Sequence, residues 1–128
     1  MKLSFTNTVI AVFVLLVVIG VAVKTYQNTK PGELDEFAQC LTENGAKMYG
    51  ADWCPNCQAQ KQMFGSSFEY IDYVQCDITP EACTAEGVDG YPTWKKHTGE
   101  ESTLAGKGVQ PLILLAETFG CELPPVGK

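Results

Sequence analysis

The amino-terminal part of the chain is a long apolar stretch. From Leu3 to Val23 the sequence carries no charged residue, and every position from Val9 to Gly20 is apolar. A helix of about 20 apolar residues is long enough to cross a lipid bilayer. The pattern predicts an N-terminal transmembrane anchor over residues 1–24, because the run is longer than the core of a typical signal peptide. A cleaved secretory signal is the alternative, since Gly20-Val21-Ala22 offers small residues at a cleavage point.

Behind this stretch the pattern changes to that of a globular domain. Segment 25–32 is polar and contains Pro31-Gly32, which is typical of a short linker. Residues 33–128 are enough for one domain with a modest core. Apolar spacing and turn residues predict, in order, a helix from Leu34 to Leu41, a strand over 46–50, a helix over 58–64, a strand over 70–76, a short helix over 80–86, strands over 93–97 and 101–104, and a helix over 111–119.

The order of these elements constrains the sheet. Early alternation of helices and strands implies parallel pairing through crossover connections. The turn signal Thr98-Gly99-Glu100 makes the last two strands an antiparallel hairpin. The predicted fold class is therefore α/β, a four-stranded mixed sheet covered by helices.

Charge and cysteine content limit the function classes. The formal net charge is −6, and no basic cluster exceeds the pair Lys95-Lys96, so nucleic acid is not expected as a partner. All six cysteines follow the apolar stretch, and so many are typical of an oxidising compartment. We expect the domain on the extracytoplasmic side of a membrane, in a periplasm, a lumen or the cell exterior, or secreted if the segment is cleaved.

The stretch ADWCPNCQAQ carries the candidate chemistry. A helix that begins after Cys54 has Pro55 at its first position, where proline costs no hydrogen bond. The sulfur of Cys54 then lies where the free backbone N–H groups and the helix dipole stabilise a thiolate. Cys57 lies one turn further on, shielded, at a distance that suits a disulfide. We predict that Cys54 attacks and Cys57 resolves in thiol-disulfide exchange.

Two other interpretations of this pair are open. A structural staple is one, although a loop of three residues would add little stability. A zinc site with Cys76 and Cys83 is the other, although six residues between those two exceed the usual ligand spacing. We expect no metal and no cofactor.

A second motif joins the first and makes a family resemblance. With Trp53-Cys54-Pro55-Asn56-Cys57 after a strand, and Gly90-Tyr91-Pro92-Thr93 before another, the region from Leu34 to Glu122 resembles the thioredoxin superfamily. The resemblance implies a thioredoxin-like fold with a cis peptide bond before Pro92. It also implies that the backbone of Tyr91 pairs with a substrate peptide as an added strand. Trp53, Pro55, Tyr91 and Pro92 are the expected substrate-binding residues.

Within the superfamily, the chain looks most like the thioredoxin-like domain associated with bacterial homologues of vitamin K epoxide reductase. The shared features are the motif from Tyr49 to Cys57, the later pair Cys76 and Cys83, and Gly90 to Trp94. This resemblance implies a quinone-linked membrane enzyme as redox partner and secreted thiols as substrates. The chain departs from ordinary thioredoxins at Met48, where they carry a buried acid.

The remaining cysteines are expected to be structural. Cys76 and Cys83 are near enough in the sequence for a local bridge, although a second redox relay is an alternative. Cys40 and Cys121 would then join the terminal helices of the domain. Four cysteines allow three pairings, so this connectivity is a hypothesis. His97 is expected at the surface, without a catalytic role.

Together these features predict a membrane-tethered protein disulfide oxidoreductase with catalytic Cys54 and Cys57. The alternatives are a redox-inert holdase that grips extended chains at the edge formed by Tyr91, or a cysteine-based metal-binding protein.

Overall fold

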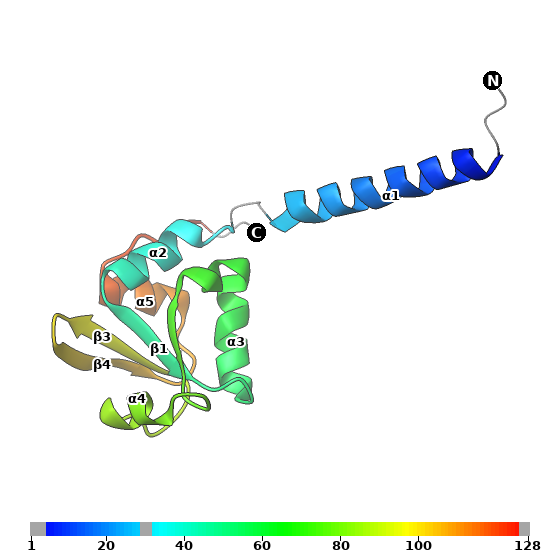
Figure 1. Cartoon of the computed structure of the whole chain (residues 1–128). Helices are drawn as coiled ribbons and strands as arrows, with labels where there is room; N and C mark the ends of the chain where they lie inside the picture. Colours follow the sequence, from blue (N-terminus) through cyan, green and yellow to red (C-terminus); the bar gives the residue numbers. More distant parts are fainter. Residues whose placement is uncertain (1–4, 29–31, 126–128) are drawn as a thin grey trace. The chain divides into compact units, whose positions relative to one another are not determined.

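The computed structural model describes residues 5–28 and 32–125, with side chains from Asn7 to Val23 in the first range (Figure 1). The chain divides into two compact units, Met1–Pro31 and Gly32–Lys128. The first unit contains helix α1 (Phe5–Asn28). It continues into segment 25–32, where a linker was predicted, and residues 29–31 lie outside the described residues.

Helix α1 was predicted to span a membrane. Within the described ranges, no helix combines the length and the apolar character needed to cross one. The predicted transmembrane helix is therefore unconfirmed.

The second unit is built on the mixed sheet that the sequence predicts. Its strands are β1 (Ala46–Gly50), β2 (Asp72–Gln75), β3 (Thr93–Thr98) and β4 (Glu101–Lys107), in the order β2-β1-β3-β4. β1 and β2 are parallel, while β1 with β3 and β3 with β4 are antiparallel. The predicted α/β class with a four-stranded mixed sheet is thus confirmed.

The helices of this unit are α2 (Asp35–Glu43), α3 (Pro55–Phe64), α4 (Pro80–Ala85) and α5 (Leu112–Phe119). α3 ends at Phe64, as predicted, with Gly65 as its C-cap residue, and a 3-10 helix that was not predicted, η1 (Gly65–Tyr70), follows it directly. β2 accordingly begins at Asp72 instead of Tyr70. At the other end, Gly120 ends α5 in the left-handed conformation with φ 70°, as a glycine at this position predicts.

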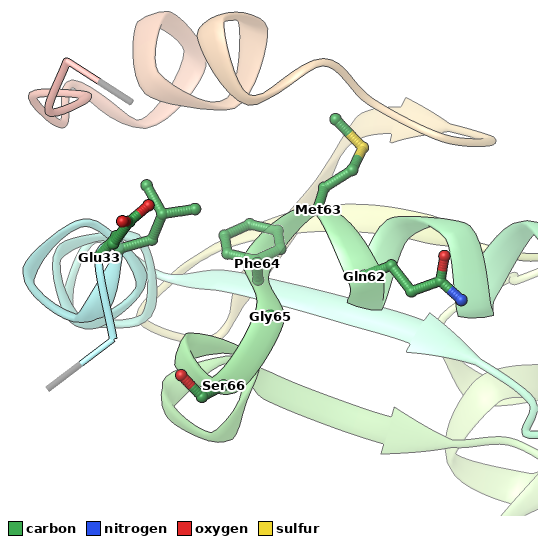
Figure 2. A pocket seen from close by; sticks show the side chains of 7 residues that line it. Glu33, Gln62, Met63, Phe64, Gly65 and Ser66 are labelled. Carbon is green, nitrogen blue, oxygen red and sulfur yellow. The ribbon is translucent and has the colours of Figure 1, made fainter. Parts of the chain in front are cut away.

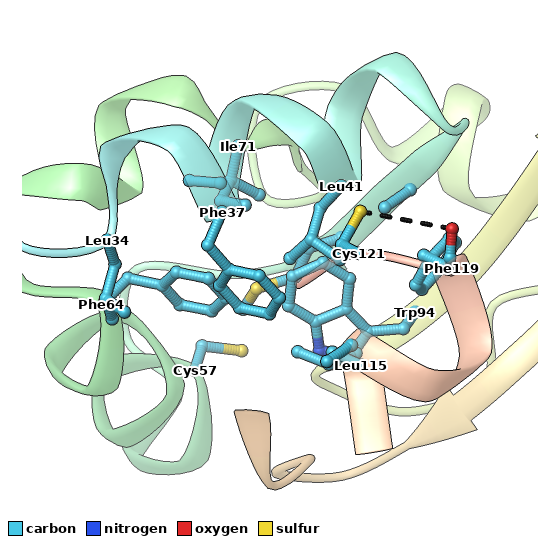
Figure 3. Packing of buried hydrophobic residues seen from close by; sticks show 14 of the residues in the cluster. Leu34, Phe37, Leu41, Cys57, Phe64, Ile71, Trp94, Leu115, Phe119 and Cys121 are labelled. Carbon is cyan, nitrogen blue, oxygen red and sulfur yellow. Dashed lines mark hydrogen bonds between the residues drawn. The ribbon is translucent and has the colours of Figure 1, made fainter. Parts of the chain in front are cut away.

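The two faces of the sheet are covered unequally. Residues of α2, α3 and α5 pack with Met48 and Trp94 into the main core, which Figure 3 shows. The opposite face carries a smaller cluster of Tyr49, Cys76 and Cys83 beneath α4. Figure 1 shows α4 across the sheet from α2 and α5. Because neighbouring residues of a strand face opposite ways, Met48 and Tyr49 on β1 separate the two clusters.

Gln60 is a polar residue within the main core and is fully buried. Its side-chain oxygen accepts hydrogen bonds from the Trp94 indole N–H at 3.3 Å and the Gln110 backbone N–H at 2.6 Å. Its side-chain nitrogen donates to the Gln110 carbonyl at 3.0 Å. These bonds satisfy the buried amide and tie α3 to β3 and to the loop before α5.

Two disulfides link secondary-structure elements of the domain. Cys40–Cys121 joins α2 to the segment after α5, and Cys76–Cys83 joins the end of β2 to α4. This is the pairing that the sequence favours among the three. Cys54 and Cys57 are the two remaining cysteines, and both are free thiols.

Candidate active site

The two free cysteines lie at the start of α3. Cys54 is the N-cap residue, with φ −80° and ψ 116°, and Pro55 occupies the first helical turn. The backbone N–H of Cys57 donates a hydrogen bond to the Cys54 sulfur at 3.3 Å. The Cys54 side chain thus caps the helix by accepting a backbone N–H, the role that a serine or aspartate has at the start of many helices. Any negative charge on this sulfur is stabilised by that N–H group and by the positive end of the helix dipole.

The two sulfurs differ in their access to solvent. Cys54 is 6% exposed and Cys57 is fully buried. Figure 3 shows the Cys57 side chain pointing from α3 toward the core that contains Phe64 and Trp94. An exposed attacking thiol was expected, and Cys54 is more covered than that because it packs against the same core. The predicted asymmetry nevertheless holds, since Cys54 alone has accessible surface.

Burial sets the chemistry of the second thiol. It raises the pKa of Cys57 to about 12, and the hydrogen bond with Cys54 adds to the effect. The Lys61 ammonium, one turn further along α3, acts in the opposite direction. Cys57 is therefore held as a neutral thiol at neutral pH, and its deprotonation must accompany any reaction in which it attacks.

The loop before β3 forms a second side of the site. The Tyr91–Pro92 peptide bond is cis, as the resemblance to thioredoxins implies. The Thr93 hydroxyl donates to the Gly90 carbonyl at 2.7 Å, and the Gly108 N–H donates to the Pro92 carbonyl at 2.7 Å. These bonds fix the loop on both sides of the cis bond.

The predicted substrate-binding residues meet at this loop. Trp53 is 70% exposed, and its ring contacts the ring of half-buried Tyr91 edge-on at a centroid distance of 6.0 Å. Trp53 precedes Cys54 and Tyr91 precedes Pro92, so the fold brings together two residues that are 38 positions apart in the sequence. Pro92 is buried beside them, while Pro55 is exposed at the start of α3.

Charged groups next to the cysteines are paired with each other. Asp52 forms an ion pair with Lys61 at 2.9 Å and accepts a hydrogen bond from the Gln75 side chain at 2.7 Å. The Lys61 ammonium also lies 4.1 Å from the centroid of the Tyr73 ring. Because Lys61 offsets its charge, Asp52 opposes a thiolate at Cys54 less than a free carboxylate would.

The inner wall of the site is formed by residues of β1 and β2. A Cβ atom placed on Gly50 would lie 2.7 Å from the Cys57 sulfur and 3.2 Å from the Tyr73 hydroxyl oxygen. Met48, two residues earlier, is fully buried and supplies no ionisable group. Sequence reasoning assigned no role to Gly50, Lys61 or Tyr73. The glycine in the Tyr49 to Cys57 motif and the spacing of Cys57 and Lys61 by one helical turn were the available signals.

The structure removes the zinc alternative. Cys76 and Cys83 are bonded to each other and cannot serve as thiolate ligands with Cys54 and Cys57. Among the residues described, no group of three or more histidine, cysteine, aspartate or glutamate side chains is placed to hold a metal ion. Both Cys76 and Cys83 are 3% exposed and lie in the smaller cluster, which fits a staple better than a second relay.

Two features lie away from the cysteines. His97, expected at the surface, is half-buried, and its Nε2 lies 3.1 Å from the Tyr49 hydroxyl in β1. A pocket of about 300 Å³ lies between Leu34 and the end of α3, where Figure 2 shows Phe64 and Glu33 at its wall. The cysteines stand at the opposite end of α3, about 15 Å away along a helix of this length. The pocket is therefore separate from the candidate active site.

Part of the chain is similar in sequence to a known protein. No family model matches the chain. Over 67 residues it is 39% identical to the thiol-disulfide oxidoreductase LTO1 of Arabidopsis thaliana, a match that covers 45% of this chain and 18% of that protein. The chain thus spans about a fifth of the length of this curated relative.

Two solved structures are similar as well. Fasciola hepatica thioredoxin matches with a TM-score of 0.48 and 19% identity, over 66% of this chain and 88% of that one. Plasmodium falciparum thioredoxin matches with a TM-score of 0.37 and 22% identity, over 50% of this chain and 59% of that one. The strand order, the cysteines at the start of α3 and the cis bond before Pro92 together make this a thioredoxin-like α/β fold.

Proposed function

We propose that this chain is a thiol-disulfide oxidoreductase that acts on protein thiols and disulfides through Cys54 and Cys57. The observation that carries the proposal is the free cysteine pair at the start of α3, with the Cys57 N–H on the Cys54 sulfur. The four other cysteines are closed in disulfides, so the free pair does not reflect a generally reduced chain. Partial identity to an oxidoreductase over 67 residues supports the same class.

The first step of the reaction uses Cys54. Its thiolate attacks one sulfur of a partner disulfide, a new S–S bond forms, and the other partner sulfur leaves as a thiolate that takes a proton from solvent. Cys54 is the member of the pair with accessible surface, so its sulfur is the one that a partner disulfide can reach. The helix N-terminus stabilises the thiolate before attack and whenever it is released again.

The second step uses Cys57. Its sulfur attacks Cys54 in the mixed disulfide, the Cys54–Cys57 bond forms, and the partner sulfur leaves as a thiolate. The proton lost by Cys57 balances the proton gained by the partner thiol. Two electrons have then passed from the cysteine pair to the partner. Run in reverse, the same steps transfer a disulfide to a partner dithiol, and the redox partner decides the direction.

The loop before β3 is the proposed guide for the partner chain. The backbone of Tyr91 would pair with an extended segment of the substrate, with Pro92 beside the reacting sulfurs. Trp53 supports this role because its exposed ring stands against Tyr91 and can cover one side of a bound segment. Pro55, exposed at the start of α3, completes the surface around Cys54.

The compartment and the redox partner are part of the proposal. Two disulfides support an oxidising, extracytoplasmic environment. A quinone-linked membrane enzyme of the vitamin K epoxide reductase type is the proposed partner, on the resemblance of the motifs around Cys54, Cys76 and Pro92. The N-terminal segment would act as an anchor or as a cleaved signal that directs the domain to this compartment.

Exchange with insulin or glutathione tests the activity. We expect Cys54→Ser to abolish exchange, while a Cys76→Ser/Cys83→Ser variant, matched in residue type, retains it. A holdase that grips extended chains would bind clients equally well with Cys54→Ser and would show no exchange in the unmodified protein, and that result would exclude the proposal.

Trapping identifies the partner. Cys57→Ala should accumulate mixed disulfides through Cys54, because the second step is removed. Recovery of a quinone-linked membrane protein in these adducts supports the proposed partner. Recovery of a thiol-reducing transporter instead would assign the chain to a reducing pathway.

A further inference from the structure

Tyr73 has a buried hydroxyl group that no described residue satisfies. It lies on β2 beside Met48 of β1, so its side chain is on the face of the sheet covered by α3. Its ring packs edge-on against Phe68 at 5.5 Å between centroids. The oxygen is inaccessible to solvent and has no hydrogen-bond partner among the residues described. A buried polar group without a partner costs about 1–3 kcal/mol and calls for a functional or structural reason.

The nearest chemistry is the Cys57 sulfur. The Tyr73 oxygen and the Cys57 sulfur both lie against the same side of Gly50, at 3.2 Å and 2.7 Å from the position of an added Cβ. Glycine is the one residue that leaves this space open. The two groups are thus neighbours within the wall of the site, although Cys57 as a neutral thiol is not hydrogen-bonded to the phenol.

Burial and nearby acidic groups keep Tyr73 a donor. Burial, followed by repulsion from Cys57 whenever that sulfur is ionised and from Asp52 and Asp77, raises the pKa of Tyr73 well above its ordinary value. Lys61 of α3 lies over its ring, while β1 contributes only the non-ionisable Met48 and Gly50 to this wall. A phenol held neutral cannot remove a proton from Cys57, but it can donate its own hydrogen to a sulfur that becomes negative.

We propose that the Tyr73 hydroxyl donates a hydrogen bond to the Cys57 sulfur as that sulfur acquires negative charge in the second step. This inference rests on the proposed function. Cys57 loses its proton and attacks Cys54, and the partner leaves as a thiol that has gained a proton, so Tyr73 keeps its own proton throughout. The bond compensates in part for the burial that makes Cys57 reluctant to ionise, and Lys61 assists it.

Reaction with 5,5′-dithiobis(2-nitrobenzoate) separates the two steps. The reduced protein should release one thionitrobenzoate in a phase that depends on reagent concentration, as Cys54 is modified. A second thionitrobenzoate should follow in a phase whose rate does not depend on reagent concentration, because Cys57 displaces the thionitrobenzoate group that is bound to Cys54. The second phase reports the step assigned to Tyr73, and the first provides an internal reference.

Tyr73→Phe removes the oxygen alone. We expect the second phase to slow about tenfold at pH 7, because a hydrogen bond to a charged group is lost. Its pH profile should shift upward by about one unit, since one pKa unit corresponds to a tenfold change. Thermal stability should be unchanged or higher, because an unsatisfied buried group has been removed.

Tyr49→Phe is the matched control. Tyr49 is buried on the opposite face of the sheet, and its hydroxyl contacts His97 instead of the cysteines. Both phases should keep their rates in this variant. An unchanged second phase in Tyr73→Phe, or an equal slowing in both variants, would overturn the role of Tyr73 while leaving the exchange activity in place. Absence of a second phase in the unmodified protein would instead overturn the proposed function.

Discussion

The amino-terminal ends of α3 and α4 are built alike but hold their cysteines in different states. Each helix has a proline in its first turn, Pro55 or Pro80, and each carries a cysteine shortly after it, Cys57 or Cys83. In α3 the cap is Cys54, whose sulfur accepts the Cys57 N–H. In α4 the cap is Thr79, whose side chain makes no cap bond and donates to the Gln75 carbonyl at 3.0 Å instead.

The difference lies in what a disulfide would connect. Cys54 and Cys57 belong to one helical turn, so closing or opening their bond changes the freedom of the unfolded chain very little. Cys76 and Cys83 belong to a strand end and a separate helix, so their bond holds α4 on the sheet. A pair within one turn can therefore cycle between dithiol and disulfide without dismantling the fold. A pair between elements serves stability.

The third pair, Cys40 and Cys121, closes the longest loop of the three cysteine pairs. Its closure spans a sequence separation of 81 residues, against 7 for Cys76–Cys83. We expect Cys40→Ala/Cys121→Ala to lower the free energy of unfolding by about 4–5 kcal/mol, because long loops lose the most entropy on cross-linking. Urea unfolding followed by circular dichroism measures the loss. A loss no larger than that caused by opening Cys76–Cys83 would show that loop length does not govern these bonds.

Opening the shorter bond comes next in size. Cys76→Ala/Cys83→Ala should lower the free energy of unfolding by about 2–3 kcal/mol, as expected for a small loop. The rate at which Cys54 exchanges with glutathione should stay within about twofold, because the bond is buried across the sheet from the main core. A large drop in exchange with little loss of stability would instead identify Cys76–Cys83 as the second relay.

The sequence predicts those features of the two helix ends that depend on local chemistry. Pro55 after Cys54 and Pro80 after Thr79 are start signals with a fixed φ. The resemblance to thioredoxins implied the cis bond before Pro92, and the two disulfides are the pairing that was favoured among the three. The predicted end of α3 at Gly65 is confirmed, but the 3-10 helix that follows was not predicted. Within it the hydroxyl of buried Ser67 accepts the Leu34 N–H at 3.2 Å, a bond between segments far apart in the chain. Such a tertiary contact leaves no local signal.

Tyr73 shows a second reason why the sequence alone does not predict the whole site. Alternation over 70–76 predicts that Tyr73 and Val74 face opposite sides of the sheet. It does not specify which side meets α3, and only the pairing of Met48 with Tyr73 decides this. The closeness of the Tyr73 oxygen to Cys57 also requires Gly50 between them. Three segments must therefore be placed before this part of the site can be recognised.

Gly50→Ala tests the wall directly. The added methyl would stand 2.7 Å from the Cys57 sulfur, so α3 or β2 must shift. We expect a loss of about 1–3 kcal/mol in unfolding free energy, the usual cost of overpacking a core. Gly90→Ala is the control, because an added Cβ there meets no atom within 4 Å. Equal stability of the two variants in thermal unfolding would mean that the residues around Gly50 accommodate the added methyl group without a loss of unfolding free energy.

The smallest expected effect concerns the far end of α4. Glu86 ends this helix and pairs with Lys95 at 2.7 Å, and the Ser102 hydroxyl donates to the same carboxylate at 2.5 Å. These hydrogen bonds, that of Lys95 first, hold the pKa of Glu86 below its ordinary value. The ionised carboxylate therefore stabilises the fold above the ordinary pKa, and this contribution is lost as pH falls through the folded-state value.

Glu86→Gln should accordingly lower the free energy of unfolding by no more than about 1 kcal/mol at pH 7, because solvent and salt still weaken a half-buried pair. The difference from the unmodified protein should shrink as the pH is lowered through the acid range, where the carboxylate of the unmodified protein is also neutral. Glu117→Gln, on the exposed side of α5, serves as the control and should show no such trend. A difference that stays constant down to low pH would mean that Glu86 acts through its shape instead of its charge. In that case α4 would depend on Cys76–Cys83 and packing alone, and the contrast between the two helix ends would rest entirely on their cysteines.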